Sequence, residues 1–212
     1  MAKKIMFNDR YGLTEAVLSG RKTMTRRIIK SKNIIARHWN PAFNADHCYY
    51  TDGRGKCQLI DTDTNKIIIP QFKVGEVVAI AMSYKDVVEH LAKKLYDVGK
   101  WMDDNYITKN MAGWLNKMFV KADLMIFHIR ITDIKVERLQ DISDEDCIKE
   151  GIIHAWTGSD GVKIYHSPHG KRGYLSTDKP RDAFAFLIDR ISGKGTWNSN
   201  PLVFAYEFEM VD

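Results

Sequence analysis

The stretch Phe127-His128-Ile129-Arg130-Ile131-Thr132-Asp133-Ile134-Lys135-Val136 decides how this chain folds. Apolar residues alternate with polar ones along most of it, which predicts a long strand with one face in the core. Further on, Ser143 is followed by acidic residues and has the character of a helix N-cap, while Gly151 is a typical helix end. The stretch therefore predicts a strand that is followed by a short helix.

Outward from this stretch, strands and helices are expected on both sides. Strands are predicted at residues 3–8, 22–29, 76–83 and 202–209, and helices at residues 11–18, 86–98 and 181–191. Residues 30–66 are polar and turn-rich, which predicts an insertion with short strands. Residues 152–180 are rich in Gly and Pro, which predicts a long loop with one hairpin at most. Strands without regular βαβ alternation predict an α+β protein with a mainly antiparallel sheet that can close into a small barrel.

Length and composition narrow the class of protein. The chain has 212 residues, of which 44% are hydrophobic and 28% charged, so one elaborated globular domain is expected. The longest apolar runs, Ile67–Ile69 and Val77–Met82, are far shorter than the roughly 18 residues of a membrane span. No signal peptide is recognised. The odd number of cysteines (Cys48, Cys57 and Cys147) predicts a reducing cytosol rather than a disulfide framework.

Positive charge is concentrated near the N-terminus. Residues 1–40 contain ten Lys or Arg against only Asp9 and Glu15, whereas the rest of the chain is slightly acidic. Such a segment suits a phosphate-bearing partner such as RNA, DNA or a nucleotide, although a solvated basic surface would have the same composition.

The densest chemistry lies in the stretch Gly20-Arg21-Lys22-Thr23-Met24-Thr25-Arg26-Arg27. If this segment is extended, Lys22 and Arg26 share one face while Thr25 and Arg27 share the other. Regular strand geometry would then separate Lys22 from Thr25, but a bend after Gly20 can bring them together. A basic strand with a solvated face remains the alternative.

These residues resemble a known signature. Gly20, Lys22 and Arg27 fit the Gly-x-Lys-x-x-Glu-x-Arg pattern of the ASCH domain, with Thr25 in place of the glutamate. About half the chain resembles ASCH proteins of bacteriophages and prophages, including residues 72–78, 129–151 and 195–201. The resemblance implies a PUA-like small β-barrel with flanking helices. It also implies a single domain over residues 1–212, with insertions at about 30–70, 84–125 and 152–180 that we expect to enlarge one rim.

The threonine motif is similar to Gly-Arg-Lys-Thr-x-Thr-x-Arg of the bacterial N4-acetylcytidine amidohydrolases. That similarity implies that Lys22, Thr25 and Glu150 are catalytic and that Arg27 binds substrate, and we expect the neighbouring Arg26 and Arg21 to assist it. The implied reaction removes an acyl group from N4 of cytidine, in a nucleoside or in RNA, without metal or cofactor. The implied setting is a bacterial or phage-infected cytosol, with no membrane and no obligate protein partner.

The residue types suit that chemistry. A threonine hydroxyl becomes nucleophilic only when a base takes its proton, and a lysine can do so when burial or neighbouring positive charge lowers its pKa. A carboxylate at Glu150 favours the ammonium form of Lys22, so Glu150 is expected to orient groups or to exchange protons with the leaving amine. A non-catalytic RNA- or nucleotide-binding module and a ribonuclease remain open as alternatives.

Two further groups of residues give weaker indications of a binding site. A zinc site could use His47, Cys48, Cys57, His166 and His169, although paired Cys-x-x-Cys motifs are absent. Aromatic residues that could stack on a base are Trp39, Trp156, Tyr165, Tyr174 and Trp197.

Overall fold

The structure, a computed structural model, describes residues 2–31, 33–38, 50–51, 56–94, 97–168 and 173–211. Its strands are β1 (Lys4–Ile5), β2 (Met24–Ile28), β3 (Ile34–His38), β4 (Tyr50–Thr51), β5 (Lys56–Asp61), β6 (Lys66–Ile67), β7 (Val77–Ile80), β8 (His128–Arg138), β9 (Ile153–Thr157), β10 (Lys163–His166), β11 (Ser176–Thr177) and β12 (Leu202–Met210). Its α-helices are α1 (Leu13–Leu18), α2 (Tyr84–Lys93), α3 (Val98–Asp104), α4 (Asp144–Lys149), α5 (Pro180–Ser192) and α6 (Thr196–Ser199). Short 3-10 helices are η1 (Asp9–Tyr11), η3 (Lys117–Phe119), η4 (Ala122–Leu124) and η5 (Leu139–Asp141).

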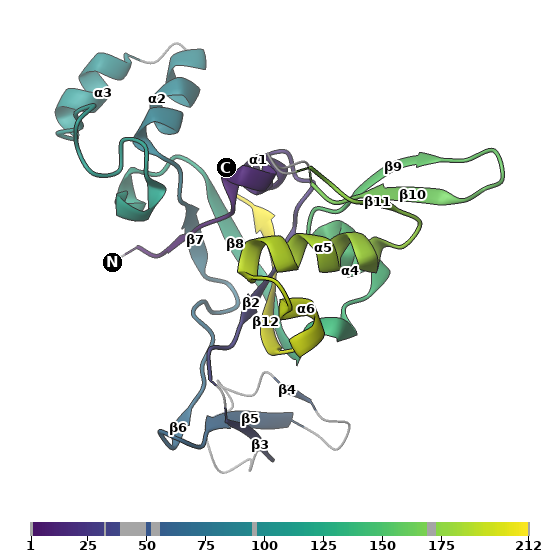
Figure 1. Ribbon diagram of the computed structural model, residues 1–212. Coiled ribbons are helices and arrows are strands. Elements are labelled where there is room, and N and C mark those ends of the chain that lie inside the picture. The colour runs from purple at the N-terminus through teal and green to yellow at the C-terminus, as the bar shows by residue number, and fades with distance from the viewer. Residues whose placement is uncertain are drawn as a thin grey trace.

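The central element is a five-stranded sheet in the order β1-β7-β8-β12-β2. The pair β1/β7 is parallel, and the other three neighbouring pairs are antiparallel. The stretch that decided the fold forms β8, in which Ile129 and Ile131 are fully buried while Arg130 and Thr132 are exposed. Its apolar alternation therefore attaches β8 to the core, and β8 curves through the middle of the molecule (Figure 1).

The predicted α+β class with a mainly antiparallel sheet is confirmed. The path of the sheet runs from β1 at one edge to β2 at the other. Among the described strands these two edges do not pair, and no closed barrel is formed.

Most predicted helices are present, with one correction. Ser143 caps α4 by accepting a hydrogen bond from the backbone of Asp146, as the sequence indicated. The single helix predicted over residues 86–98 is wrong, because α2 ends at Lys93 and α3 begins at Val98. Asp97 caps α3 by accepting from the Lys100 amide, so a second helix begins where the apolar spacing alone suggested continuation.

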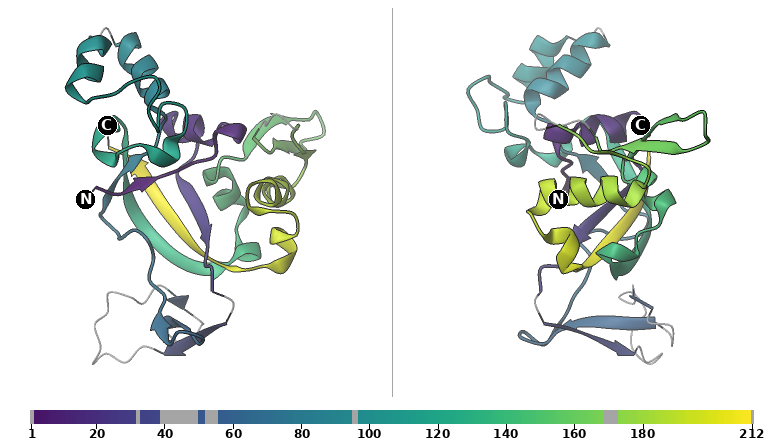
Figure 2. Two further views of the ribbon diagram at one scale, coloured as in Figure 1. Left: turned by 60° about the vertical axis from the view of Figure 1, so that its left-hand side comes forward. Right: turned by 45° about the vertical axis from the view of Figure 1, so that its right-hand side comes forward.

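The insertions fold into separate units. The first contains the strand order β3-β5-β4 with β6 paired to β5, and residues 152–180 contain the antiparallel strands β9, β10 and β11 rather than a hairpin at most. Figure 2 shows the β3–β6 unit and the α2–α3 unit at opposite ends of the central sheet. The expectation that the insertions enlarge one rim is therefore wrong.

The helices of the described residues are all too short or too polar to cross a bilayer.

Candidate functional site

The segment before β2 places Lys22. The chain turns at Gly20, which has a φ of 72°, and the amide of Lys22 donates to the carbonyl of Ala16 on α1 at 2.8 Å. The amide of Thr23 donates to the carbonyl of Lys149 on α4 at 2.9 Å. A left-handed turn is inexpensive for glycine, so the motif leaves α1 sharply and reaches α4 before β2 begins.

Lys22 and Glu150 form a buried ion pair. Their side chains are 2% and 6% exposed, and the Lys22 Nζ lies 2.6 Å from Glu150 Oε2. The same Nζ donates to the carbonyl oxygens of Met24 at 2.7 Å and of Glu150 at 2.8 Å. These three acceptors match the three hydrogens of an ammonium group.

Arg26 reaches the same carboxylate from β2. Its Nη1 lies 3.2 Å from Glu150 Oε1, its Nη2 lies 2.7 Å from Asp146 Oδ2, and its Nε donates to Glu137 Oε1 at 2.8 Å. Lys135 on β8 joins the group, 2.7 Å from Asp146 Oδ2 and 3.2 Å from Glu137 Oε2. We call this set the buried ion cluster; it consists of Lys22, Arg26, Lys135, Glu137, Asp146 and Glu150. Its cations and carboxylates are equal in number.

Electrostatics differ among the members of the buried ion cluster. Burial lowers the pKa of Lys22, with Glu150 acting in the opposite direction and the charges of Arg27 and Arg26 adding to the lowering. For Arg26, burial also disfavours the charge, but Glu150, Glu137 and Asp146 outweigh it and raise the pKa. Arg26 is thus a fixed cation, whereas Lys22 is the cation that loses its proton more easily than an ordinary lysine.

Thr25 and Arg27 extend to the other side of β2. Thr25 is 6% exposed and lies opposite Tyr206 of β12. Arg27 Nη2 donates to the carbonyl of Met6 at 2.6 Å, and its guanidinium lies 5.9 Å from the centre of the Phe7 ring.

The Arg27 guanidinium is not neutralised. Its Nε is buried without a hydrogen-bond partner, and no carboxylate of the described residues forms an ion pair with it. Burial accordingly lowers the pKa of Arg27, although the more distant Glu150 acts in the opposite direction. Arg26 and Arg27 are adjacent in sequence, yet their partners differ completely.

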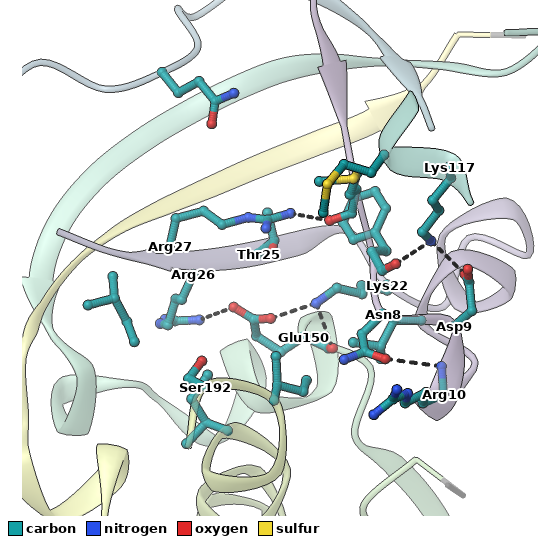
Figure 3. A pocket seen from close by; sticks show the side chains of 18 of the residues that line it. Asn8, Asp9, Arg10, Lys22, Thr25, Arg26, Arg27, Lys117, Glu150 and Ser192 are labelled. Atoms are coloured by element: carbon teal, nitrogen blue, oxygen red, sulfur yellow. Dashed lines mark hydrogen bonds and ion pairs between the residues drawn. The ribbon is translucent and has the colours of Figure 1, made fainter. Parts of the chain in front are cut away.

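A cavity of about 1040 Å³ lies at this site (Figure 3). Of the predicted site residues, the cavity brings together Lys22, Thr25, Arg26, Arg27 and Glu150. Arg21 is exposed and lies outside the cavity, and Arg26 is held by carboxylates rather than offered to a ligand. The structure therefore supports neither of these two arginines as a substrate contact.

A second part of the lining was not foreseen. Met6–Arg10 and Leu115–Met118 form a wall that we call the N-terminal wall, and α5 contributes Phe184, Ile188, Ile191 and Ser192. Lys117 holds the wall together, since its Nζ contacts the Phe7 carbonyl, Asp9 Oδ1 at 2.7 Å and Thr14 Oγ1 at 3.1 Å. Asn8 caps η1 by accepting a hydrogen bond from the Arg10 amide, whereas no local pattern in the sequence places Lys117 beside Phe7 and Asp9.

The predicted zinc site and the predicted base-stacking aromatic residues find little support around the cavity. His47, Cys48, His169 and Trp39 lie outside the described residues. The described part of the chain contains no group of three or more potential metal ligands. None of Trp156, Tyr165, Tyr174 and Trp197 lines the cavity; Trp156 is exposed on β9 and Trp197 packs against Phe184 at 6.1 Å.

Comparisons with protein-family models, with curated proteins and with solved structures give no match. The function is therefore inferred from the geometry of the cavity.

Proposed function

We propose that the protein is an N4-acylcytidine amidohydrolase of the ASCH type, acting on a modified cytidine in the cytosol. The observation that carries the proposal is the buried Lys22–Glu150 pair, 2.6 Å apart, at the same cavity as Thr25. An amine that shares a cavity with a threonine hydroxyl can activate that threonine for attack on an acyl carbon once the two approach each other. The resemblance of residues 20–27 to the bacterial N4-acetylcytidine amidohydrolases agrees with it.

In the proposed first step, Lys22 in its amine form takes the proton of the Thr25 hydroxyl. The oxygen bonds to the acyl carbon, the bond from that carbon to N4 breaks, and the proton passes to N4 so that cytidine leaves. Glu150 holds the Lys22 amine in place through Oε2 while Arg26 holds Oε1. This contact makes Arg26 a positioning residue for Glu150.

In the second step, water attacks the acyl-threonine ester. Lys22 takes a proton from the water, the ester bond breaks, and Thr25 recovers its hydrogen as the carboxylic acid leaves. Both steps use the same amine, which must be unprotonated at the start of each. Because burial lowers the pKa of Lys22, kcat/KM should rise with pH through a pKa below the ordinary value of 10.5.

The decisive experiment is incubation with N4-acetylcytidine while the ultraviolet absorbance change of deacylation is followed. Thr25→Val keeps the β-branched shape and removes the hydroxyl, so hydrolysis should fall by about 100-fold or more while the fold persists. Lys22→Met should abolish the pH-dependent rise as well as the activity. If Thr25→Val hydrolyses normally and Lys22→Met does not, the covalent mechanism is wrong and a lysine-activated water replaces it.

One observation favours a second function, a binding module for a modified nucleoside or RNA without catalysis. All three hydrogens of the Lys22 ammonium already have acceptors, so the resting cavity offers no lone pair to Thr25. Saturable binding of N4-acetylcytidine without any hydrolysis would establish this alternative.

We further propose that the central sheet with α1 and α4 is the core of a PUA-like fold. The antiparallel order β7-β8-β12-β2 and the curvature of β8 support this assignment. An experimental structure in which β7, β8, β12 and β2 do not follow one another in this order would contradict the assignment.

A further inference from the structure

The positive charge of the cavity is not evenly neutralised. Every cation of the buried ion cluster has a carboxylate within 3.2 Å. On the remaining lining, Arg10, Arg27 and Lys30 form no ion pair with a carboxylate in the described part of the chain, and Asp9 is already engaged by Lys117. The cavity thus has an excess of positive charge, and its least exposed component is Arg27, a half-buried side chain whose Nε is fully buried.

A partly desolvated cation without a counter-ion is stabilised when a ligand supplies the missing charge. Arg27 uses Nη2 for the Met6 carbonyl, and its buried Nε remains without a partner. The unsatisfied donor and the unneutralised charge are two separate deficits in the same side chain. An oxygen anion beside the guanidinium would supply the missing charge.

We propose that Arg27, assisted by Arg10 and Lys30, binds a phosphate group of the substrate, so that the ligand of this cavity is a nucleotide rather than an uncharged nucleoside. Arginine suits this role because its planar donors match phosphate oxygens and its charge persists at all physiological pH values. The identity of the nucleotide as an N4-acylated cytidine rests on the proposed function; the phosphate site itself does not.

The dimensions and chemistry of the cavity accommodate both parts of such a ligand. Its volume of about 1040 Å³ is at the upper end of the range of small-molecule sites, about 300–1000 Å³, so a nucleoside leaves room for a phosphate. Phe184, Ile188 and Ile191 of α5 supply an apolar surface for the base and acyl group. A ligand that is apolar at one end and anionic at the other matches these two surfaces.

The phosphate site can be tested without any enzymatic assay, by titration calorimetry with inorganic phosphate at constant ionic strength. Wild-type protein should bind phosphate saturably, and Arg27→Gln should weaken binding by about tenfold or more. Arg21→Gln is the matched control, because Arg21 belongs to the same motif but is exposed and outside the cavity, and its affinity should equal that of the wild type. Equal weakening by Arg21→Gln, or no saturable binding by the wild type, would overturn the proposal.

Two exposed positions keep the test informative even if Arg27→Gln fails to fold. Arg10 and Lys30 lie at the surface, so Arg10→Gln and Lys30→Gln should fold normally, and each should weaken phosphate binding by a smaller factor than Arg27→Gln. If both variants bind phosphate as the wild type does, the assisting roles assigned to them are wrong.

Hydrolysis then identifies the source of the phosphate. We expect kcat/KM for N4-acetylcytidine 5′-monophosphate to exceed that for N4-acetylcytidine by about tenfold or more, with the preference lost in Arg27→Gln. A short RNA containing N4-acetylcytidine supplies a phosphodiester, whereas the 5′-monophosphate supplies a phosphomonoester. The one with the higher kcat/KM identifies which kind of phosphate the site binds. Equal losses on nucleoside and nucleotide in Arg27→Gln would place Arg27 at the reacting carbonyl and refute the phosphate role. Phosphate binding without hydrolysis of any substrate would refute the proposed function and leave the phosphate site standing.

Discussion

The two sides of the cavity differ in how their positive charge is neutralised, with a buried arginine on one side and a half-buried arginine on the other. On the side of β8 and α4, Arg26 meets the carboxylates of Glu137, Asp146 and Glu150. On the side of the N-terminal wall, Arg27 meets a carbonyl and an aromatic ring but no carboxylate among the described residues. The alternation of β2 sends the two neighbouring arginines to these different surroundings. The charges of the first side are therefore balanced without a ligand, whereas the second side retains an unbalanced positive charge.

The largest loss of stability is expected when the buried ion cluster loses one of its cations. Arg26→Met removes one cation and leaves three buried or half-buried carboxylates with too few partners, so the free energy of unfolding should fall by about 3–5 kcal/mol. Lys149→Met is the control, because its 2.6 Å pair with Glu207 is partly exposed and should contribute at most about 1 kcal/mol. Urea denaturation of both variants measures the contrast. Losses of similar size would show that the buried ion cluster contributes no more to stability than a partly exposed ion pair.

A smaller and pH-dependent effect is expected at Asp146. Burial would raise the pKa of Asp146, but hydrogen bonds from Lys135 and Arg26 outweigh it and lower the pKa below 3.8. A lowered carboxyl pKa means that the stabilisation is complete above 3.8 and is lost as pH falls through the folded-state pKa. The stability advantage of the wild type over Asp146→Asn should therefore be greatest near neutral pH and shrink in acid. Denaturation curves at several pH values below 5 test this, and an advantage that stays constant into acid would contradict the assignment.

The smallest effect is expected on the side that retains the unbalanced positive charge. Arg27→Met removes a half-buried charge that lacks a counter-ion, so its lost contacts are offset by relief of desolvation, and stability without ligand should change by no more than about 1 kcal/mol. The same denaturation assay, repeated with phosphate, should show stabilisation of the wild type that Arg27→Met lacks. A loss as large as that of Arg26→Met in the absence of ligand would mean that Met6 and Phe7 already neutralise the guanidinium well enough, and it would remove the reason to expect an anion.

The sequence predicted most of the central sheet, because its signals are local. The alternation of β8, the Ser143 cap of α4 and the glycine after α1 each act within a few residues, and each element formed where it was expected. The third strand in residues 152–180 was missed because β11 is only two residues long and obtains its position from pairing with β10. Pairing of that kind leaves no periodic pattern in the sequence.

The candidate site was predictable only in part, for the same physical reason. The motif directed attention to Lys22 and Thr25, and the resemblance added Glu150. The carboxylate partners of Arg26 were not foreseen because Glu137 and Asp146 are separated from it by more than a hundred residues. Lys117 was missed because only tertiary folding brings it to Asp9. Charge pairs across such distances become visible only in three dimensions.

The position of β12 between β8 and β2 has a consequence for the timing of folding. β2 carries Thr25, Arg26 and Arg27, and its one strand partner in the described part of the chain, β12, comes after every other strand of the sheet. At about 5–20 residues per second, a ribosome adds β12 on the order of ten seconds after β2. Throughout that interval β2 is an unpaired edge, the kind of strand that aggregates unless charge opposes it. We expect its two arginines to oppose such pairing in the nascent chain.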